Sequence, residues 1–594
     1  MCAINGYNFP DKNLILKMKE FTSNRGPDAE GLYIDENITI YHNRLSILDL
    51  NKIADQPMSY KNFIISFNGE IYNYKELRNE LIRFGYNFKT NSDTEVILHL
   101  FDKYNIDSFS KLSGIFSICI WDKLKKKLYL IRDTLGVKPL YYYLEKNTNK
   151  FFFSSSIRSL LISLKEKQLN PIALDYYMNF GRNDYSETIF KNIFKLMPGE
   201  LLTLENNNLK KNKLLNFDFN YEDKSNEELK SIVEKTIQKQ LISDVPSSLS
   251  LSGGVDSNIV YSVMRKNLDN KFNIYSFKFK DYKKFNEDFS VAEKNAKYYK
   301  SNFIPVEIGF DEFINNGEKV TEILEEPTAN QCSILNYCMS KKIKEKVLIT
   351  GDGGDETFTG YDRYRSIHII NFLQNFNPFK KLKIQTKYKN INRFFVNDPK
   401  QMFLEFSEQN VYKDLDKYYK DFKKIKKNEI GLHHTSKYAL KNYLNSVGFL
   451  DLDTLVPNEY LLRNDKIFMD SAIEVRVPFL DVDIINNFLM MSPGKKFAYR
   501  FKSKQLLKNI FKKDIHSLVK KKWGLQSPIA KWMKGSLQPY LKEILNKDYY
   551  TGSSKYLNFE NINKLITLHK EKYHNPDLLW SLVMIQIFLR KFKL

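Results

Sequence analysis

The sequence predicts a protein of two domains, α/β and α+β in class, the second built on a parallel β-sheet. Three observations lead to this prediction. The chain has 594 residues, more than a single hydrophobic core usually organises. Short apolar runs alternate with segments of helical periodicity along most of its length. A stretch rich in Asn, Lys and Asp, residues 206–224, interrupts this alternation and is expected to be a linker.

The first domain is expected over residues 2–205. The runs FIISF (63–67) and KLYLIRD (127–133) have the composition of strands. The segment YKELRNELIRFGY (74–86) has the apolar spacing of a helix. Strands and helices therefore alternate in this part of the chain.

The second domain is expected over residues 225–594 and begins with Ser-Asn-Glu-Glu at 225–228, a capping-box pattern that opens a helix. Strand, glycine-containing turn and helix then alternate, as they do around a parallel sheet. A mostly helical stretch is predicted at about 362–455. The apolar segment 578–592 is expected to be a packed helix.

Composition excludes several classes of protein. Hydrophobic residues make up 42% of the chain and aromatic residues 14%, enough for packed cores and too much for global disorder. The chain contains no apolar run of about 18 residues, which a membrane span needs, and no signal-peptide pattern. We therefore expect a cytoplasmic protein that does not bind membranes. The four cysteines include no CxxC pair and the eight histidines no HExxH pattern, so neither a disulfide framework nor a zinc site is expected.

The formal charge of +22 allows two interpretations. Clustered Lys and Arg would attract nucleic acid. Here the lysines are spread along the chain and accompany an excess of Asn, Ile and Tyr, as a coding bias produces. No RNA- or DNA-binding motif is present. We therefore favour the coding bias and do not expect a nucleic-acid partner, although positive charge would also favour an anionic ligand such as ATP.

Cys2 directly follows the initiator methionine. Removal of the methionine would leave an α-amino group of pKa about 8, which can act as the base for the Cys2 thiol. A cysteine at this position is weak support by itself. Four further segments follow it in order and at compact spacing: RGPD (25–28), HNRLSILD (42–49), FNGEIYN (67–73) and NSDTEV (91–96).

With these segments, about residues 2–200 resemble the class II glutamine amidotransferase domain of glutamine-dependent asparagine synthetases, an N-terminal-nucleophile hydrolase. The resemblance implies an αββα sandwich. It also implies that Cys2 attacks the glutamine amide and releases ammonia. The side chain of Asn68 and the backbone N–H of Gly69 would then form the oxyanion hole, since two aimed donors suit a developing oxyanion.

The resemblance further assigns the binding of the glutamine substrate. Arg44 would hold the α-carboxylate through a fork-shaped charge pair. Asp93, with help from Glu70, would bind the α-ammonium group. Each motif also has an ordinary structural interpretation: a hairpin turn for Asn68-Gly69, a helix cap for Asp93 and a surface ion pair for Arg44. The presence of all of them in this order favours the binding site.

The segment SLSLSGGVDSNIVYSVM (248–264) has the pattern of a strand, a glycine turn and a helix. The hexad SGGVDS (252–257) would place backbone N–H groups at the helix N-terminus, where anions bind. The hexad is not a P-loop, because no GxxxxGK[ST] occurs. It resembles the pyrophosphate loop of enzymes that cleave ATP to AMP and pyrophosphate. The structural alternative is an ordinary strand-to-helix turn.

A second glycine loop, GDGGDETFTGYDRY (351–364), follows the strand VLIT (347–350). Loops at the carboxyl ends of neighbouring parallel strands meet at one edge of the sheet. Asp256 and Asp355 are therefore expected to bind Mg²⁺, which prefers hard oxygen ligands. A calcium-like loop or a plain turn is the alternative, but the alternating carboxylates of an EF-hand are absent.

About residues 225–540 resemble the C-terminal domain of asparagine synthetases, with further matches at 460–481 and 520–533. The resemblance implies a Rossmann-like ATP-pyrophosphatase domain with added helices. Asp352 occupies the position of the family's catalytic acidic residue and Lys522 that of a lysine near the α-phosphate. The residues implied in ATP binding are Leu251, Ser252, Gly253, Gly254, Asp256, Ser257, Phe279, Thr350 and Gly351.

The sequence also departs from the family's pattern. The usual Phe-Gly-Gly-Tyr reads Phe-Thr-Gly-Tyr at 358–361, and Asp352 stands where some members have Glu. Phe468 and Asp470 replace residues that are commonly smaller. These differences affect the prediction of which carboxylate accepts the ammonia more than the prediction of ATP cleavage.

The resulting hypothesis is a glutamine-hydrolysing asparagine synthetase whose substrates are glutamine, aspartate and ATP, with Mg²⁺ as cofactor. Ammonia released at Cys2 would pass through a shielded passage to a second site. There it would convert β-aspartyl-AMP to asparagine, with AMP and pyrophosphate as co-products. Three alternatives stay open: amidation of another carboxylate, such as a polysaccharide uronic acid or a peptide; a tRNA-modifying ATP pyrophosphatase; and a non-catalytic relative. A homodimer is also left open.

Overall fold

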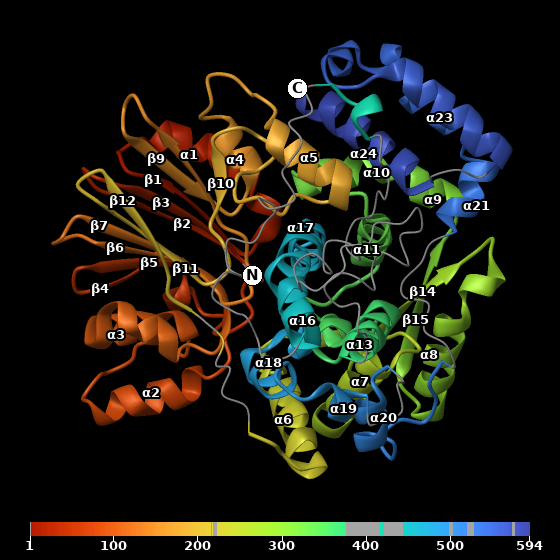
Figure 1. Ribbon diagram of the computed structural model, residues 1–594. Coiled ribbons are helices and arrows are strands. Elements are labelled where there is room, and N and C mark those ends of the chain that lie inside the picture. The colour runs from red at the N-terminus through yellow and green to blue at the C-terminus, as the bar shows by residue number, and fades with distance from the viewer. Residues whose placement is uncertain are drawn as a thin grey trace.

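Two antiparallel six-stranded sheets form the N-terminal domain in a computed structural model of the protein (Figure 1). The structure describes residues 2–215, 217, 222–375, 415–420, 443–497, 503–519, 528–572 and 576–594. In spatial order, the first sheet consists of β10 (Ile193–Lys195), β8 (Tyr141–Glu145), β9 (Lys150–Ser154), β1 (Ala3–Tyr7), β3 (Thr39–Arg44) and β2 (Ala29–Ile34). The second consists of β12 (Asn208–Lys213), β11 (Glu200–Glu205), β7 (Lys127–Arg132), β6 (Gly114–Asp122), β5 (Phe63–Ile71) and β4 (Met58–Tyr60).

The two sheets pack face to face through apolar side chains such as Ile4, Ile40 and Leu130, all fully or almost fully buried. On the outer face of the first sheet lie α1 (Lys12–Lys19) and α4 (Ile157–Leu161). On that of the second lie α2 (Tyr74–Arg83) and α3 (Asp93–Tyr104). Because each sheet must bury both of its apolar faces, the layers follow the order αββα, as predicted.

Part of the segment expected to be a linker, 206–224, belongs to this domain. Strand β12 pairs with β11 along its whole length. Between them Asn206 and Asn207 have φ angles of 48° and 61°, as a two-residue hairpin turn requires. The Asn-rich composition at the start of this segment therefore encodes a tight turn.

A five-stranded parallel sheet forms the centre of the C-terminal domain, which confirms the predicted architecture. Its order is β15 (Asn302–Ile308), β14 (Asn273–Phe279), β13 (Ser247–Ser250), β16 (Val347–Ile349) and β17 (Glu474–Arg476). Alternate residues of β16 point to opposite faces: Val347 and Ile349 lie in one core cluster and Leu348 in another. The sheet is thus buried on both sides, as parallel sheets usually are.

Helices cover both faces of the parallel sheet. One face packs against α6 (Asn226–Lys239) and α7 (Val255–Leu268), and the other against α10 (Gly317–Leu324), α11 (Cys332–Ser340) and α17 (Leu461–Met469). Helix α6 begins with the predicted capping box, in which the Ser225 and Glu228 side chains each bond the other's backbone N–H. The other helices used below are α12 (Gly354–Thr357), α13 (Asp362–Asn375), α16 (Tyr443–Asp453), α20 (Gln505–Ile510) and α24 (Pro576–Phe592).

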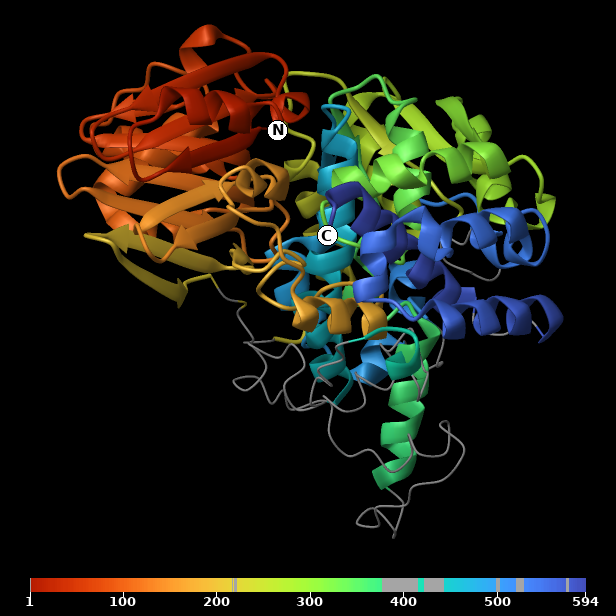
Figure 2. The same cartoon turned by 90° about the horizontal axis from the view of Figure 1, so that it is seen from above.

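The helical predictions hold where the structure describes the chain. Of the stretch 362–455, α13 and α16 are helical, whereas 376–414 and 421–442 lie outside the described residues. The apolar segment 578–592 lies within α24, whose side chains are mostly buried. None of the described helices combines the length and apolar character needed to cross a membrane. In Figure 1, α17 lies between the strands of the N-terminal domain and α11 of the C-terminal domain. Figure 2 shows the same two domains side by side, seen from above.

Candidate active sites

The first site is a pocket at the N-terminal end of β1. Residues from β3, β5 and the start of α3 surround it. Its lining includes five of the predicted residues: Cys2, Arg44, Gly69, Glu70 and Asp93. The structure therefore brings together residues that are spread over the first 93 positions of the chain.

The backbone N–H and the carbonyl oxygen of Cys2 both form hydrogen bonds. Its backbone N–H donates to Asn68 Oδ1 over 3.0 Å, and its carbonyl oxygen accepts from Arg25 Nε over 3.3 Å. The residue is 7% exposed, and burial raises the pKa of the Cys2 thiol. A thiol in this state needs a nearby base before it can act as a nucleophile.

Asn68 and Gly69 lie in the middle of β5, paired with Ser117 and Phe116 of β6. The hairpin-turn interpretation is therefore wrong. Gly69 has a φ of 152°, and a Cβ at this position would lie 2.0 Å from the carbonyl oxygen of Ile115, so only glycine fits. The Asn68 side chain is fully buried beside the pocket, and its Nδ2 donates to Ser117 Oγ over 3.4 Å.

Arg44 is buried rather than part of a surface ion pair. Its Nη1 donates to Asp55 Oδ1 over 2.6 Å, and its terminal nitrogens also donate to backbone carbonyls of the loop that follows β3. The guanidinium is thereby fixed at the wall of the pocket. Its terminal N–H groups are engaged by the protein, so a carboxylate bound here has to use Nε or displace one of these contacts.

Asp93 is the first residue of α3, but the cap of this helix is Ser92, whose side chain accepts from the N–H of Thr94. Asp93 Oδ2 instead accepts from the backbone N–H of Ile71 over 2.9 Å. Burial raises the pKa of Asp93 to about 6. Burial also raises the pKa of Glu70, with further contributions from Glu474 and Asp93. Two buried carboxyl groups at one pocket favour a cationic ligand.

The second site is a cavity of about 460 Å³ at the carboxyl ends of β13, β14 and β16. Gly253 and Gly254 are not among its lining residues, and Lys522 lies outside the described residues. The predicted residues that do line it are Leu251, Ser252, Asp256, Ser257, Phe279, Thr350, Gly351, Asp352 and Asp355.

The 252–257 loop is closed by its own hydrogen bonds. The hydroxyl oxygens of Ser252 and Ser257 are 3.0 Å apart, and the N–H of Gly254 donates to Ser252 Oγ over 3.2 Å. Asn258 Nδ2 donates to the carbonyl oxygens of Ser252 and Gly254 over 2.9 and 2.7 Å. The loop thus leads directly into α7, whose N-terminus favours an anion.

The second glycine loop packs directly against the first. A Cβ on Gly351 would lie 2.6 Å from the backbone nitrogen of Ser257, which explains why a glycine stands there. In the same region Thr359, at the position where the family usually has glycine, has a φ of 54°. Threonine disfavours this left-handed conformation.

Lys504 lies between the two carboxylates that were expected to bind Mg²⁺. It precedes α20, is 3% exposed, and forms ion pairs with Asp256 and with Asp355, the latter over 2.5 Å. Among the described residues, no group of three or more His, Cys, Asp and Glu could hold a metal ion by itself. The two carboxylates nevertheless converge on one cation, and Mg²⁺ takes one or two carboxylates and completes its shell with water and phosphate. The residues present therefore fit Mg²⁺ together with a nucleotide.

Asp352 is tied to helix α17. Its Oδ2 accepts from Thr350 Oγ1 over 3.1 Å and from Asn464 Nδ2 over 2.7 Å. Of the two unusual residues of α17 and its C-terminal end, Phe468 lines the cavity. Asp470 contacts Asn24 and Lys341 outside it. Only Phe468 can therefore affect what the cavity accepts.

Comparison with known proteins identifies the family. A family model described as asparagine synthase matches residues 228–590, and one described as a glutamine amidotransferase domain matches residues 1–215. The chain belongs to the asparagine synthase family. This confirms the resemblance inferred from the sequence, and the enzyme is of the glutamine-hydrolysing, amidotransferase-containing type.

Relatives of this asparagine synthase family member differ in their names. Asparagine synthetase [glutamine-hydrolyzing] 1 of Bacillus subtilis (strain 168) is 28% identical over 97% of this chain and 93% of its own length. Putative asparagine synthetase [glutamine-hydrolyzing] 2 of Methanocaldococcus jannaschii is 32% identical over 64% of this chain and 80% of its own. Amidase chry2 of Gibberella zeae is 24% identical over 89% of this chain and 87% of its own.

In this family member, consecutive residues of α17 contact the two sites. Asp465 forms a bidentate ion pair with Arg25, over 2.7 and 3.2 Å, and Arg25 in turn donates to the carbonyl of Cys2. Asn464 donates to Asp352 in the cavity. A second buried contact joins the domains through Arg476 of β17, whose Nη2 lies 3.8 Å from Glu70.

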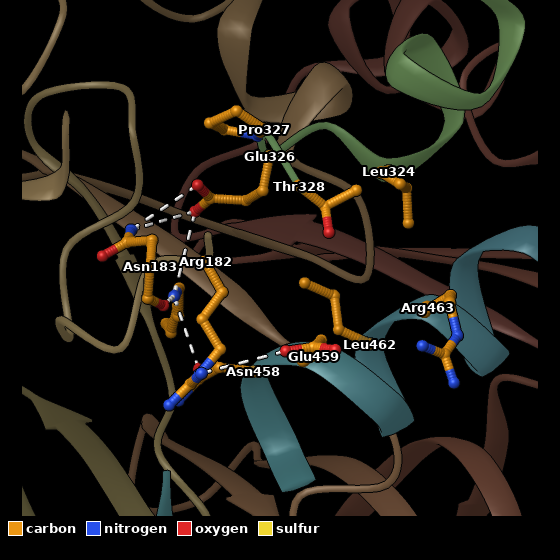
Figure 3. Close-up of a pocket in the computed structure, with 11 residues that line it drawn as sticks. Arg182, Asn183, Leu324, Glu326, Pro327, Thr328, Asn458, Glu459, Leu462 and Arg463 are labelled. Carbon is orange, nitrogen blue, oxygen red and sulfur yellow. Dashed lines mark hydrogen bonds and ion pairs between the residues drawn. The ribbon is translucent and has the colours of Figure 1, made fainter. Parts of the chain in front are cut away.

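A smaller pocket lies at the domain interface (Figure 3). Arg182 pairs with Glu459 over 3.8 Å, and Asn183 donates to Glu326 over 3.4 Å. Figure 3 also shows Arg463 at the edge of this group, with no contact drawn to it. Arg463 lines both this pocket and the cavity.

Sequence reasoning did not identify Lys504, Asn464 or Arg463. Lys504 stands in a lysine-rich segment, KSKQLLKNIFKK, where no local pattern distinguishes one lysine from the next. Asn464 and Arg463 lie in the segment 460–481, whose resemblance to the family assigns no role to either residue.

Proposed function

We propose that the protein is a glutamine-hydrolysing asparagine synthetase. The observation that carries this proposal is the connection of two differently built sites to one helix. The pocket at Cys2 reaches α17 through Arg25 and Asp465, and the cavity at the 252–257 loop reaches it through Asp352 and Asn464. Such an arrangement suits an enzyme in which one site supplies a reagent to the other.

In the glutaminase half, the α-amino group of Cys2, freed by removal of the initiator methionine, takes the thiol proton. The thiolate attacks the glutamine amide carbon, and the C–N bond breaks as the α-ammonium group of Cys2 returns its proton to the leaving nitrogen, which departs as ammonia. Water then hydrolyses the resulting thioester to glutamate and frees Cys2. The N–H of Gly69 and Nδ2 of Asn68 stabilise the oxyanion. Nδ2 donates one of its two N–H groups to Ser117 in this structure, and the second can donate to the oxyanion.

The glutamine backbone groups bind at the pocket wall. Arg44 pairs with the α-carboxylate, and Asp93 and Glu70 pair with the α-ammonium group. The buried position of all three side chains supports this assignment, because charged partners are recognised most strongly where water is excluded.

In the synthetase half, the β-carboxylate of aspartate attacks the α-phosphate of ATP, which gives β-aspartyl-AMP and pyrophosphate. The N–H groups of the 252–257 loop and Lys504 bind the leaving pyrophosphate. Asp256 and Asp355 would hold Mg²⁺, which supplies further charge neutralisation there. Phe279, Thr350 and Gly351 contact the adenosine part. Lys522 stays a prediction at the α-phosphate.

Ammonia from the first site then attacks the acyl carbon of β-aspartyl-AMP. The new C–N bond forms as the C–O bond to AMP breaks, and Asp352 takes the proton that the nitrogen loses. A passage through the domain interface keeps the ammonia away from bulk water, where it would be protonated. A cytoplasmic location and a homodimeric assembly stay predictions.

Mass spectrometry of the products tests the proposal. With glutamine, ATP, Mg²⁺ and aspartate, the enzyme should form asparagine, AMP and pyrophosphate, and AMP formation should stop when aspartate is omitted. AMP formed without aspartate, or a reaction that consumes glutamine and ATP but yields no asparagine, would contradict the choice of acceptor.

A second candidate is amidation of another carboxylate by the same chemistry. It is favoured by Phe468, which lines the cavity where family members commonly have a smaller residue. The acceptor panel should therefore include a uronic acid and a peptide C-terminus. An amide product from either of these, with none from aspartate, would select this candidate.

A further inference from the structure

Arg463 of α17 has a buried guanidinium group in which two nitrogen atoms lack a hydrogen-bond partner among the described residues. The residue is 8% exposed. Its Nε and Nη1 atoms have no hydrogen-bond partner, and the structure records no ion pair for it among the described residues. Yet it lines the 460 Å³ cavity. A charged side chain that is removed from water usually has its donors satisfied, because an unpaired buried charge is unfavourable.

The protein around Arg463 orients the guanidinium and compensates its charge only at a distance, because Asp352 and Glu459 act on it electrostatically without a recorded hydrogen bond or ion pair. The guanidinium lies 5.2 Å from the centre of the Tyr460 ring, a distance at which a cation and an aromatic face attract each other. Nearby Glu459 already has Asn330 and Arg182 as partners. Asp352 has Thr350 and Asn464. The carboxylates close to Arg463 are therefore engaged elsewhere.

The position of Arg463 separates it from the groups that suit the triphosphate. Pyrophosphate can be bound by the loop between β13 and α7 and by Lys504. Arg463 comes from a different element, α17, and directly precedes Asn464, which donates to Asp352. It thus lies beside the residue proposed to act on the acyl carbon, where the acceptor has to be.

We propose that Arg463 binds a second carboxylate of the acceptor, the one that is not activated. This inference rests on the proposed function and deepens it, because it assigns the acceptor to the dicarboxylic amino acids. A guanidinium presents paired N–H donors that match a carboxylate. For aspartate, Arg463 would hold the α-carboxylate while the β-carboxylate reacts with ATP. A uronic acid, which has one carboxylate, would leave Arg463 unpaired.

The test compares two acceptors in two enzymes. Aspartate and 3-aminopropanoate differ only in the α-carboxylate. Pyrophosphate release is measured with ammonium chloride as the nitrogen source, so that the Cys2 site is not needed. Arg463→Met should raise the KM for aspartate about 100-fold, as loss of one partner of a buried charge pair does, and change kcat much less. The same substitution should alter kcat/KM for 3-aminopropanoate less than threefold.

Two further variants serve as controls. Arg463→Lys keeps the positive charge but lacks the paired N–H donors of a guanidinium. It should therefore raise the KM for aspartate less than Arg463→Met does. Arg365→Met makes the same substitution at an exposed arginine of α13 and should change neither KM. The fold of each variant is checked by its circular dichroism and by its glutaminase activity.

The outcomes separate this inference from the proposed function. Wild-type enzyme that forms no asparagine would overturn the proposed function itself. Asparagine formation by Arg463→Met with an unchanged KM for aspartate would overturn only the role of Arg463. An equal loss with both acceptors, or a raised KM for ATP, would assign Arg463 to the nucleotide site and also overturn the inference.

Discussion

The two candidate sites are built in opposite ways. The pocket at Cys2 draws on the first 94 residues, and its polar groups bond one another or the loops that hold them, as Arg44 does with Asp55. The cavity draws on residues from 250 to 468 and includes a cationic group, Arg463, whose Nε and Nη1 have no hydrogen-bond partner among the described residues. In a site for one fixed substrate, the polar groups can be hydrogen-bonded before the substrate binds. In the cavity, some polar groups gain their partners only when a ligand binds.

Of the substitutions that test this comparison, Cys2→Ala should change the reaction rates most. It removes the nucleophile, so glutamine-dependent asparagine formation should fall by about 1,000-fold or more. Ammonia-dependent formation, which uses only the cavity, should stay within about twofold of wild type. Both rates are measured by asparagine release. Equal loss of both activities would show that the two sites do not divide the reaction.

Asp256→Ala should produce the reverse pattern. It removes one of two carboxylates that converge on a single cation in the cavity, and AMP formation should fall about 100-fold or more. Hydrolysis of glutamine should remain measurable, because Cys2 has no contact with this loop. AMP release and glutamate release are followed in the same sample. Wild-type AMP formation by the variant would remove Asp256 from the metal site.

The pH dependence of glutamine binding sharpens the comparison further. Burial raises the pKa of Asp93 to about 6, and only ionised Asp93 can pair with the α-ammonium group. The KM for glutamine should therefore rise about tenfold for each pH unit below about 6. Aspartate KM in the ammonia-dependent reaction should not follow this profile.

The same shift has a consequence for stability. Because the pKa of Asp93 is higher in the folded than in the unfolded state, the folded state holds the proton more tightly. Its contribution to the free energy of unfolding therefore falls as pH rises from about 4 to about 6 and is constant above. Asp93→Asn should remove both the KM profile and this slope. Glu70→Gln tests whether the neighbouring carboxyl group, rather than Asp93, is responsible.

Thr359→Gly should have the smallest effect. Thr359 is buried and has a φ of 54°, a conformation that costs a residue with a side chain about 1–2 kcal/mol. Glycine removes this strain but gains about 0.5–1 kcal/mol of unfolded-state freedom, so the free energy of unfolding should rise by about 0.5–1 kcal/mol. Urea denaturation measures it. A lower midpoint would show that the threonine side chain contributes more than the strain costs.

Short segments predicted much of the first site and of both folds. The β13–α7 connection and the parallel sheet followed from the alternation of apolar runs and glycine turns. Gly69 and Asp93 followed from motifs whose spacing along the chain is small. Even there the structural alternatives could be decided only in three dimensions, since pairing of β5 with β6 excludes a turn at Asn68.

The residues in and next to the cavity could not be predicted in the same way. Lys504 and Asp256 are separated by 248 positions, and only the folded chain places them in contact. Arg463 stands in a buried helix, at a position where the helical spacing of its neighbours would also allow an apolar residue. No local sequence pattern therefore identifies it as a ligand-binding group. The hairpin turn at the start of the expected linker could not be predicted for a different reason: linkers and tight turns are both rich in Asn.

Helix α17 has a consequence for the mutational tolerance of the protein. Residues 463, 464 and 465 face the cavity, Asp352 and Arg25 respectively, and successive helical residues point about 100° apart. A substitution at one of these positions alters a single contact. Insertion or deletion of one residue before them would rotate all three by about 100°, so one change in register would disconnect both active sites together.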